Sequence, residues 1–191
     1  MVDDALGQLL DRRVQRELSA PVERGTIEAW RAVFGNEWPE CVGDVAPSVM
    51  FTTFVRPPLP PAPGEAAPPR TAQEPVSFAW TEAFNVTAES IRREAAANHV
   101  WAGAHHHTEA AQKAGLADII LDTSSQVARL AGAAQRHRST ERITGINLAM
   151  KRPILPGATV TLGGVETDRT TIVSAVVDGR ETSRVTVTFG G

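Results

Sequence analysis

Three consecutive histidines, His105, His106 and His107, are the residues of this 191-residue chain whose types most directly suggest chemistry. Histidine exchanges protons near neutral pH and is also a common metal ligand. Adjacent side chains in an extended segment point in alternate directions, so at most His105 and His107 face the same way. The nearest further ligands, Glu109 and Asp122, do not complete a recognised zinc spacing, and we therefore expect no metal site. A catalytic base at His105 and a polar turn are the alternatives that remain.

The segment "DTSSQ" that begins at Asp122 supplies a second group of candidate residues. Thr123 followed by Gln126 forms a capping-box pattern, which predicts that a helix begins there. The backbone N–H groups of Thr123 and Ser124 would then point out of the helix N-terminus, where they can bind a carbonyl oxygen. Asp122 is a candidate acid at the same place, or else a second helix-capping residue. Trp101 is a candidate wall of a ligand pocket, although an aromatic residue beside a core helix is also typical of plain packing.

The region after residue 75 has the pattern of a compact domain that could position these side chains. A stripe of small apolar residues at helical spacing predicts a buried helix near residues 118–136. Four β-rich runs follow it, separated by short turn sequences, and such closely spaced strands favour an antiparallel sheet. The stripe of the buried helix consists of Val127, Leu130, Ala131 and Ala134. Before the buried helix we expect a strand near residues 76–87, a helix capped near Thr87 and a helical turn stopped by Gly115. The expected fold class is α+β, with an antiparallel sheet wrapped round a central helix.

A proline-rich segment divides the chain. Residues 56–75 hold eight of the thirteen prolines, and proline removes a backbone donor and fixes φ, so a linker or a loop at the edge of a pocket is expected there. Residues 1–55 contain helical periodicity at 3–18 and 25–36, which predicts a helical N-terminal extension. Residues 76–191 form the expected main domain.

Composition and charge argue against several classes of protein. The formal net charge of -3 provides no broad basic surface for nucleic acid. The single cysteine, Cys41, excludes an intramolecular disulfide and fits a reducing compartment. No apolar run approaches the roughly 20 residues needed to cross a bilayer, and the acidic start is unlike a secretory signal. We expect a cytoplasmic protein without a nucleic-acid or membrane partner.

The order of motifs from His105 onward resembles a known family. His105, Ala111 and Gly115 form the pattern H-x-x-x-x-x-A-x-x-x-G, "DII" leads into the expected buried helix, and "RPILPGATVTLGG" resembles the strand pair "RPVxPGDTL". These motifs make residues 76–191 similar to the MaoC-like (R)-specific enoyl-CoA hydratase and dehydratase family. The resemblance implies a hot-dog fold and an acyl thioester of coenzyme A or an acyl carrier protein as ligand, with no cofactor. It also implies a homodimer, or a heterodimer with a hydratase-like subunit, and makes residues 1–55 the vestige of a preceding hot-dog half.

One departure from the family pattern concerns catalysis. The family motif D-x-N-P-x-H places its histidine on His105, but its aspartate falls on Val100 and its asparagine on Ala102. Valine can neither activate water nor protonate a carbon. Asn98 or His99 could reach the site if the loop carries a shift of register, but either would change the chemistry. Two hypotheses therefore stand: a hydratase- or dehydratase-like lyase of lipid, sterol or polyketide metabolism with altered chemistry, and a non-catalytic subunit that binds an acyl chain or completes an active partner's pocket.

Under the first hypothesis each candidate residue has a role. His105 is the acid or base and Asp122 assists it. His107 stands where relatives often carry an acidic residue, and it either contacts substrate or orders the loop. The expected substrate-binding residues are Trp101, His107, Thr123 and Ser124.

Overall fold

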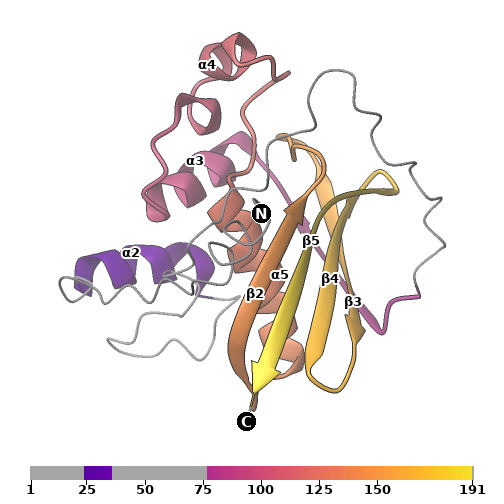
Figure 1. Ribbon diagram of the computed structural model, residues 1–191. Helices are drawn as coiled ribbons and strands as arrows, with labels where there is room; N and C mark the ends of the chain where they lie inside the picture. Colours follow the sequence, from indigo (N-terminus) through magenta and orange to yellow (C-terminus); the bar gives the residue numbers. More distant parts are fainter. Residues whose placement is uncertain (1–23, 36–76, 191) are drawn as a thin grey trace, which may run out of the picture.

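The computed structural model describes residues 24–35 and 77–190, and its main feature is a five-stranded antiparallel sheet (Figure 1). The strands lie in the order β1-β3-β4-β5-β2, so β1 and β2 form the two edges. Short turns join β3 to β4 and β4 to β5, as the turn sequences of the chain predict. The strands are β1 (Trp80–Asn85), β2 (Arg142–Met150), β3 (Thr159–Glu166), β4 (Thr170–Val177) and β5 (Arg180–Gly190).

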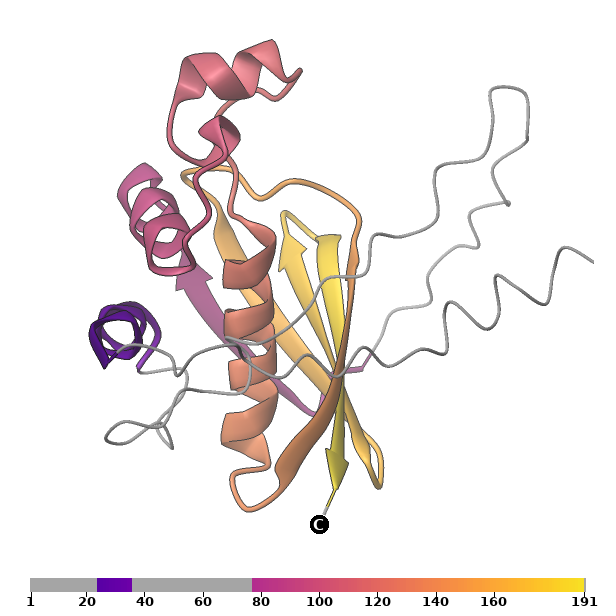
Figure 2. The same ribbon diagram turned by 60° about the vertical axis from the view of Figure 1, so that its left-hand side comes forward.

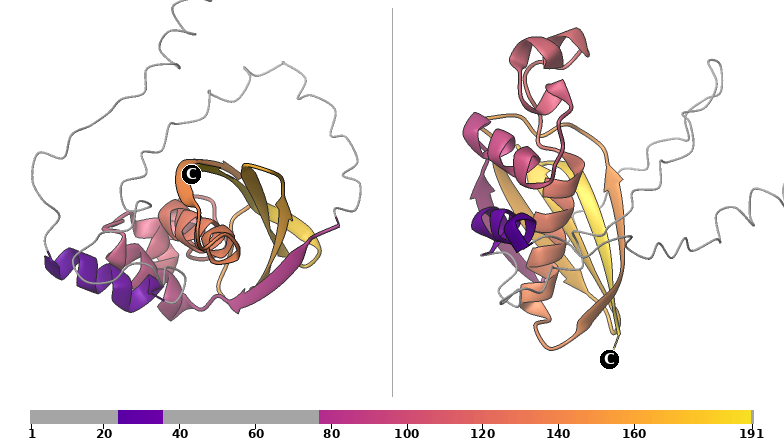
Figure 3. Two further views of the ribbon diagram at one scale, coloured as in Figure 1. Left: turned by 90° about the horizontal axis from the view of Figure 1, so that it is seen from below. Right: turned by 90° about the vertical axis from the view of Figure 1, so that its left-hand side faces the viewer.

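The long helix α5 (Thr123–His137) lies in the curve of this sheet, as the view along its axis shows (Figure 3). All four residues of the predicted apolar stripe are buried. The two alanines among them let the helix approach β4 and β5, whose buried residues include Val173, Val185 and Val187. Each large apolar side chain buried in this way stabilises the fold by roughly 1.5–3 kcal/mol. The core thus holds α5 against the sheet.

A second layer of helices covers the side of α5 that the sheet leaves open (Figure 2). Helix α3 (Ala88–Ala97) contacts α5, and helix α2 (Arg24–Phe34) lies beside α3. The 3-10 turn η2 (Gly103–His105) and the short helix α4 (Thr108–Lys113) follow α3 and lie near the N-terminal end of α5. The loop that carries the three histidines is therefore held between these helices and the start of α5.

Most of the expected elements are confirmed, including the sheet wrapped round a buried helix. Thr87 caps α3 by accepting a hydrogen bond from the Ser90 N–H at 3.0 Å, and Gly115 ends α4 with a positive φ of 83°. The buried helix begins at Thr123, next to the predicted cap and later than the start of the broader range 118–136, because the chain before it is extended and the Leu121 N–H donates to the Ile154 carbonyl at 2.9 Å.

The remaining expectations concern the N-terminal part of the chain. Of the two predicted N-terminal helices, the second is confirmed as α2. The helix predicted at 3–18 and the proline-rich segment at 56–75 lie outside the described residues. No helix in the described part of the chain is long and apolar enough to cross a membrane.

Candidate functional site

His105 ends the η2 turn, and its ring is held by the segment that leads into α5. The Nδ1–H of His105 donates to the Ile120 carbonyl at 2.8 Å. The Ile120 N–H in turn donates to the Ala104 carbonyl at 3.2 Å, so two hydrogen bonds join η2 to this segment. Because a carbonyl can only accept, Nδ1 carries the proton of the neutral ring and Nε2 is left as a base. The His105 ring is half-buried and held in one orientation, with Nε2 as the nitrogen that does not face Ile120.

The other two histidines do not join His105 in one cluster. The Nε2–H of His106 donates to the Val100 carbonyl at 2.7 Å, and the His106 carbonyl accepts from Arg92 Nε at 2.9 Å. His107 is exposed at the start of α4 and makes no capping hydrogen bond there. Within residues 24–35 and 77–190, no group of three histidine, cysteine, aspartate or glutamate side chains is arranged to hold a metal ion.

Asp122 is the N-cap of α5, which corrects the predicted capping box. The carboxylate accepts the Ser125 N–H at 2.9 Å and the Ser125 hydroxyl, and only 1% of the residue is exposed. Thr123 is therefore the first residue of the helix and not its cap. The prediction was wrong by one residue because both are good capping types, and only Asp122 has the extended backbone and the reach to Ser125. A buried carboxylate at the positive end of the helix is also electrostatically favourable.

The first turn of α5 presents two backbone donors beside this cap. Among the described residues, the N–H groups of Thr123 and Ser124 have no hydrogen-bond partner, whereas those of Ser125 and Gln126 are bonded to Asp122. Both Thr123 and Ser124 are half-buried. Two free N–H groups at a helix N-terminus can bind a carbonyl oxygen on which negative charge develops.

Trp101 lies on the surface of the same loop. Its side chain is 69% exposed and stacks on the His106 ring, with centroids 5.8 Å apart and planes at 19°. Plain core packing, one of the two interpretations of this residue, is therefore wrong. Its predicted contact with an acyl chain stays a prediction, as does the contact of His107 with substrate.

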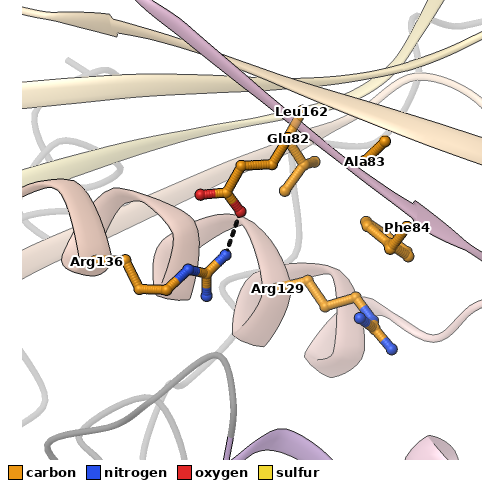
Figure 4. Close-up of a pocket in the computed structure, with 6 residues that line it drawn as sticks. All are labelled: Glu82, Ala83, Phe84, Arg129, Arg136 and Leu162. Carbon is orange, nitrogen blue, oxygen red and sulfur yellow. Dashed lines mark hydrogen bonds and ion pairs between the residues drawn. The ribbon is translucent and has the colours of Figure 1, made fainter.

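A small cavity of about 90 Å³ lies elsewhere, between β1 and α5 (Figure 4). Arg136 forms an ion pair with Glu82 at its edge, and the Arg129 guanidinium lies 4.3 Å from the centre of the Phe84 ring. Arg129 also binds the fully buried Glu94. None of the predicted site residues lines this cavity. The residues that do line it are Glu82, Ala83, Phe84, Arg129, Arg136 and Leu162.

The structure also brings together residues that the sequence did not link. Asn98, at the C-cap of α3, donates from Nδ2 to Ser125 Oγ at 3.0 Å and lies 3.4 Å from Asp122 Oδ1. Its Oδ1 accepts from the Trp30 indole N–H at 3.0 Å. The partners are 27, 24 and 68 residues away in the sequence, and no local pattern could have paired them.

Comparison with known proteins supports the fold of the domain. No family model and no curated protein matches the sequence. Many solved structures are similar, among them three at 15–16% sequence identity. The full-length peroxisomal multifunctional enzyme type 2 from Drosophila melanogaster has a TM-score of 0.56 at 15% identity, with 68% of this chain and 25% of that chain covered. The MaoC-like dehydratase from Phytophthora capsici has a TM-score of 0.55 at 16% identity, with 66% and 47% covered.

The third similar structure is close to this domain in length. The (R)-hydratase from A. caviae involved in PHA biosynthesis has a TM-score of 0.50 at 15% identity, with 61% of this chain and 96% of that chain covered. The chain thus spans about a quarter of the length of the Drosophila melanogaster enzyme and about half of the Phytophthora capsici dehydratase. It spans nearly the whole length of the A. caviae hydratase. All three agree with the antiparallel sheet wrapped round α5. The described domain therefore has the hot-dog fold.

Proposed function

We propose that this protein is an acyl-thioester hydratase- or dehydratase-like lyase, which adds water to, or removes it from, the double bond of an enoyl thioester. The observation that carries the proposal is the bond from His105 Nδ1–H to the Ile120 carbonyl. It leaves Nε2 free to take a proton, and it ties this base to the segment that leads into α5, where two N–H groups are free among the described residues.

The proposed chemistry needs one base and one pair of donors. The N–H groups of Thr123 and Ser124 would bind the thioester carbonyl and stabilise the enolate oxygen as it gains charge. In the hydration direction, His105 Nε2 takes a proton from water while the water oxygen bonds to the β-carbon. The imidazolium then returns that proton to the α-carbon, and dehydration is the reverse. A single histidine would thus do both transfers, which accounts for a site with Val100 at the family's aspartate position.

We further propose that Asp122 assists from the helix cap. Its two oxygens already accept from the Ser125 N–H and hydroxyl, and the residue is nearly completely buried. These contacts favour a role in orienting the first turn of α5 over direct proton transfer.

A non-catalytic acyl-binding subunit is the second candidate. The observation in its favour is Val100 itself, which is half-buried and whose carbonyl is occupied by His106. A pocket that binds a thioester without turning it over would need the Thr123 and Ser124 donors but no aspartate.

Both candidates include a partner subunit, either a second copy or a hydratase-like protein. The edge strand β2 pairs with β5 along one side, and among the described strands nothing pairs with its other side. Long edge strands are usually covered because their free N–H and carbonyl groups invite pairing with other chains. Sedimentation as a monomer at micromolar concentration, with and without a candidate hydratase-like subunit, would contradict this part of the proposal.

The test of the function compares binding with turnover. The full chain is titrated with crotonyl-coenzyme A in a calorimeter and assayed for hydration of the same compound, alone and with a candidate hydratase-like subunit. Turnover by the chain alone supports the lyase. Binding without turnover, and a gain of activity only in the mixture, would favour the acyl-binding subunit. Neither binding nor turnover with crotonyl or longer enoyl thioesters would overturn both.

A further inference from the structure

Helix α2 belongs to the N-terminal extension, yet it is packed into the domain close to the candidate site. Ile27, Trp30 and Phe34 lie on one face of the helix and are all buried. The Trp30 and Phe34 rings are 4.8 Å apart. This face lies against α3, on the side of α5 that the sheet does not cover (Figure 2). The apolar packing accounts for the position of α2 but not for its polar contact with Asn98.

That polar contact fixes the orientation of the Asn98 amide. The indole N–H of Trp30 is only a donor, so the Asn98 atom 3.0 Å from it must be the amide oxygen. The amide nitrogen then points the opposite way, to Ser125 Oγ at 3.0 Å and Asp122 Oδ1 at 3.4 Å. An Asn98 side chain turned by 180° would place two donors against each other at Trp30.

The contacts continue into the first turn of α5 without a break. Ser125 Oγ accepts from Asn98 and donates to Asp122, and the Ser125 N–H donates to the other oxygen of the same carboxylate. Ser125 is fully buried and Asp122 is 1% exposed. All hydrogen bonds run in one direction, from the indole through the amide and hydroxyl to the carboxylate, and such chains strengthen one another in a buried setting.

We infer that Asn98 is a positioning residue of the site and that helix α2 contributes to the site by orienting Asn98 through Trp30. Trp30 orients Asn98, and Asn98 holds Ser125 and Asp122 so that the Thr123 and Ser124 N–H groups face the ligand carbonyl. The last step rests on the proposed function, but the hydrogen-bond chain itself does not. Helix α2 is therefore expected to control carbonyl binding by α5 without touching substrate.

The experiment is a double-mutant cycle on the full chain with two readouts. Trp30→Phe removes the indole donor and keeps an aromatic ring, and Asn98→Ala removes the amide. The first readout is the exchange rate of the Ser125 backbone N–H, and the second is kcat and KM for crotonyl-coenzyme A. Trp30→Phe should speed exchange by about 2- to 10-fold, the range of one neutral hydrogen bond, and should lower kcat more than it raises KM. In the Asn98→Ala background the same substitution should have a clearly smaller effect on both readouts, because the link is already broken and only the packing of the indole is lost.

A packing control separates positioning from general loosening. Phe34→Leu removes buried aromatic surface from the same helix face and leaves the Trp30 donor in place, so its effect should be equal with and without Asn98. The inference would be overturned if Trp30→Phe had equal effects with and without Asn98, or if the effect of Phe34→Leu depended on Asn98. It would also be overturned if, in an active enzyme, Trp30→Phe changed the exchange rate of the Ser125 N–H but left kcat unchanged. A wild type that neither binds nor turns over thioesters, but retains the exchange coupling, would refute the proposed function while supporting the positioning of α5 by Asn98.

Discussion

Asp122→Asn distinguishes a helix cap from a proton-transfer group, because the two roles predict opposite patterns of activity and stability. Asparagine is as good an N-cap as aspartate, so its side-chain oxygen can keep the Ser125 N–H bond now 2.9 Å long. The new amide nitrogen, however, faces the Ser125 hydroxyl, which presently donates to the carboxylate. That hydroxyl already accepts from Asn98, so it must accept a second bond and leave its own hydrogen without this partner.

The size of the effect follows from these contacts. One charge-assisted bond becomes neutral and one buried donor loses its acceptor, which should lower the free energy of unfolding by about 1–3 kcal/mol. For a domain of this size the melting temperature should fall by roughly 3–10 °C. Loss of the negative charge loosens the first turn but keeps it capped, so we expect kcat for crotonyl-coenzyme A to fall by less than about 10-fold.

The assay measures thermal unfolding and hydration kinetics of wild type and Asp122→Asn side by side. Asp118→Asn is the matched control for turnover, because it also replaces a hydrogen-bonded carboxylate in the loop before α5 but leaves the cap intact, so it should lose stability and keep wild-type kcat. A loss of about 100-fold or more in kcat with an unchanged melting temperature would refute the cap and identify Asp122 as the acid or base.

Three further predictions concern the surroundings of the site. Val100→Asp restores the family's acid and should therefore raise the rate of hydration of enoyl thioesters. It should also lower the melting temperature, because a half-buried carboxylate loses solvation. A stably folded variant without a gain in kcat/KM would contradict this prediction. Hydrogen bonds from the Thr108 hydroxyl, then from a backbone N–H, hold the pKa of Asp118 below its ordinary value, so the stability it contributes is present above that value and is lost as the pH falls through the lowered pKa. Urea unfolding at several acidic pH values should therefore show a shallower acid loss for Asp118→Asn than for wild type. Arg129→Met should lower the free energy of unfolding by about 3–5 kcal/mol, because the carboxylate of Glu94 is fully buried; a loss under 1 kcal/mol in chemical denaturation would mean that other contacts hold this carboxylate.

The elements that could be predicted from sequence are those with a repeating local signal. The small-residue stripe of α5 and the turn-separated strands were identified because their periods of 3.6 and 2 reflect which face is buried. Thr87 and Gly115 were identified because a cap and a left-handed stop each depend on one residue type. The start of α5 was misplaced where Asp122 and Thr123, two capping types, are adjacent, since only the folded backbone decides which side chain reaches Ser125.

The arrangement of the site depends on contacts that carry no such signal. The ring orientations of His105 and His106 depend on backbone carbonyls 15 and 6 residues away, and every residue type offers the same carbonyl. The link from Trp30 to Asn98 crosses 68 residues and joins two side chains that are each unremarkable in their own helices. The expected alternation of neighbouring side chains assumed an extended segment, whereas His105 ends the η2 turn, and it could not predict that the His105 and His106 rings would bind different segments.

The measurement that tests the central claim most directly is the effect of His105→Ala on hydration of crotonyl-coenzyme A. If Nε2 of His105 transfers the proton, kcat/KM should fall by about two to four powers of ten while the melting temperature and thioester binding change little. His137→Ala, which removes a histidine at the far end of α5 that pairs with Glu82, is the control and should retain wild-type turnover. An active wild type whose kcat/KM is the same after His105→Ala would contradict the account.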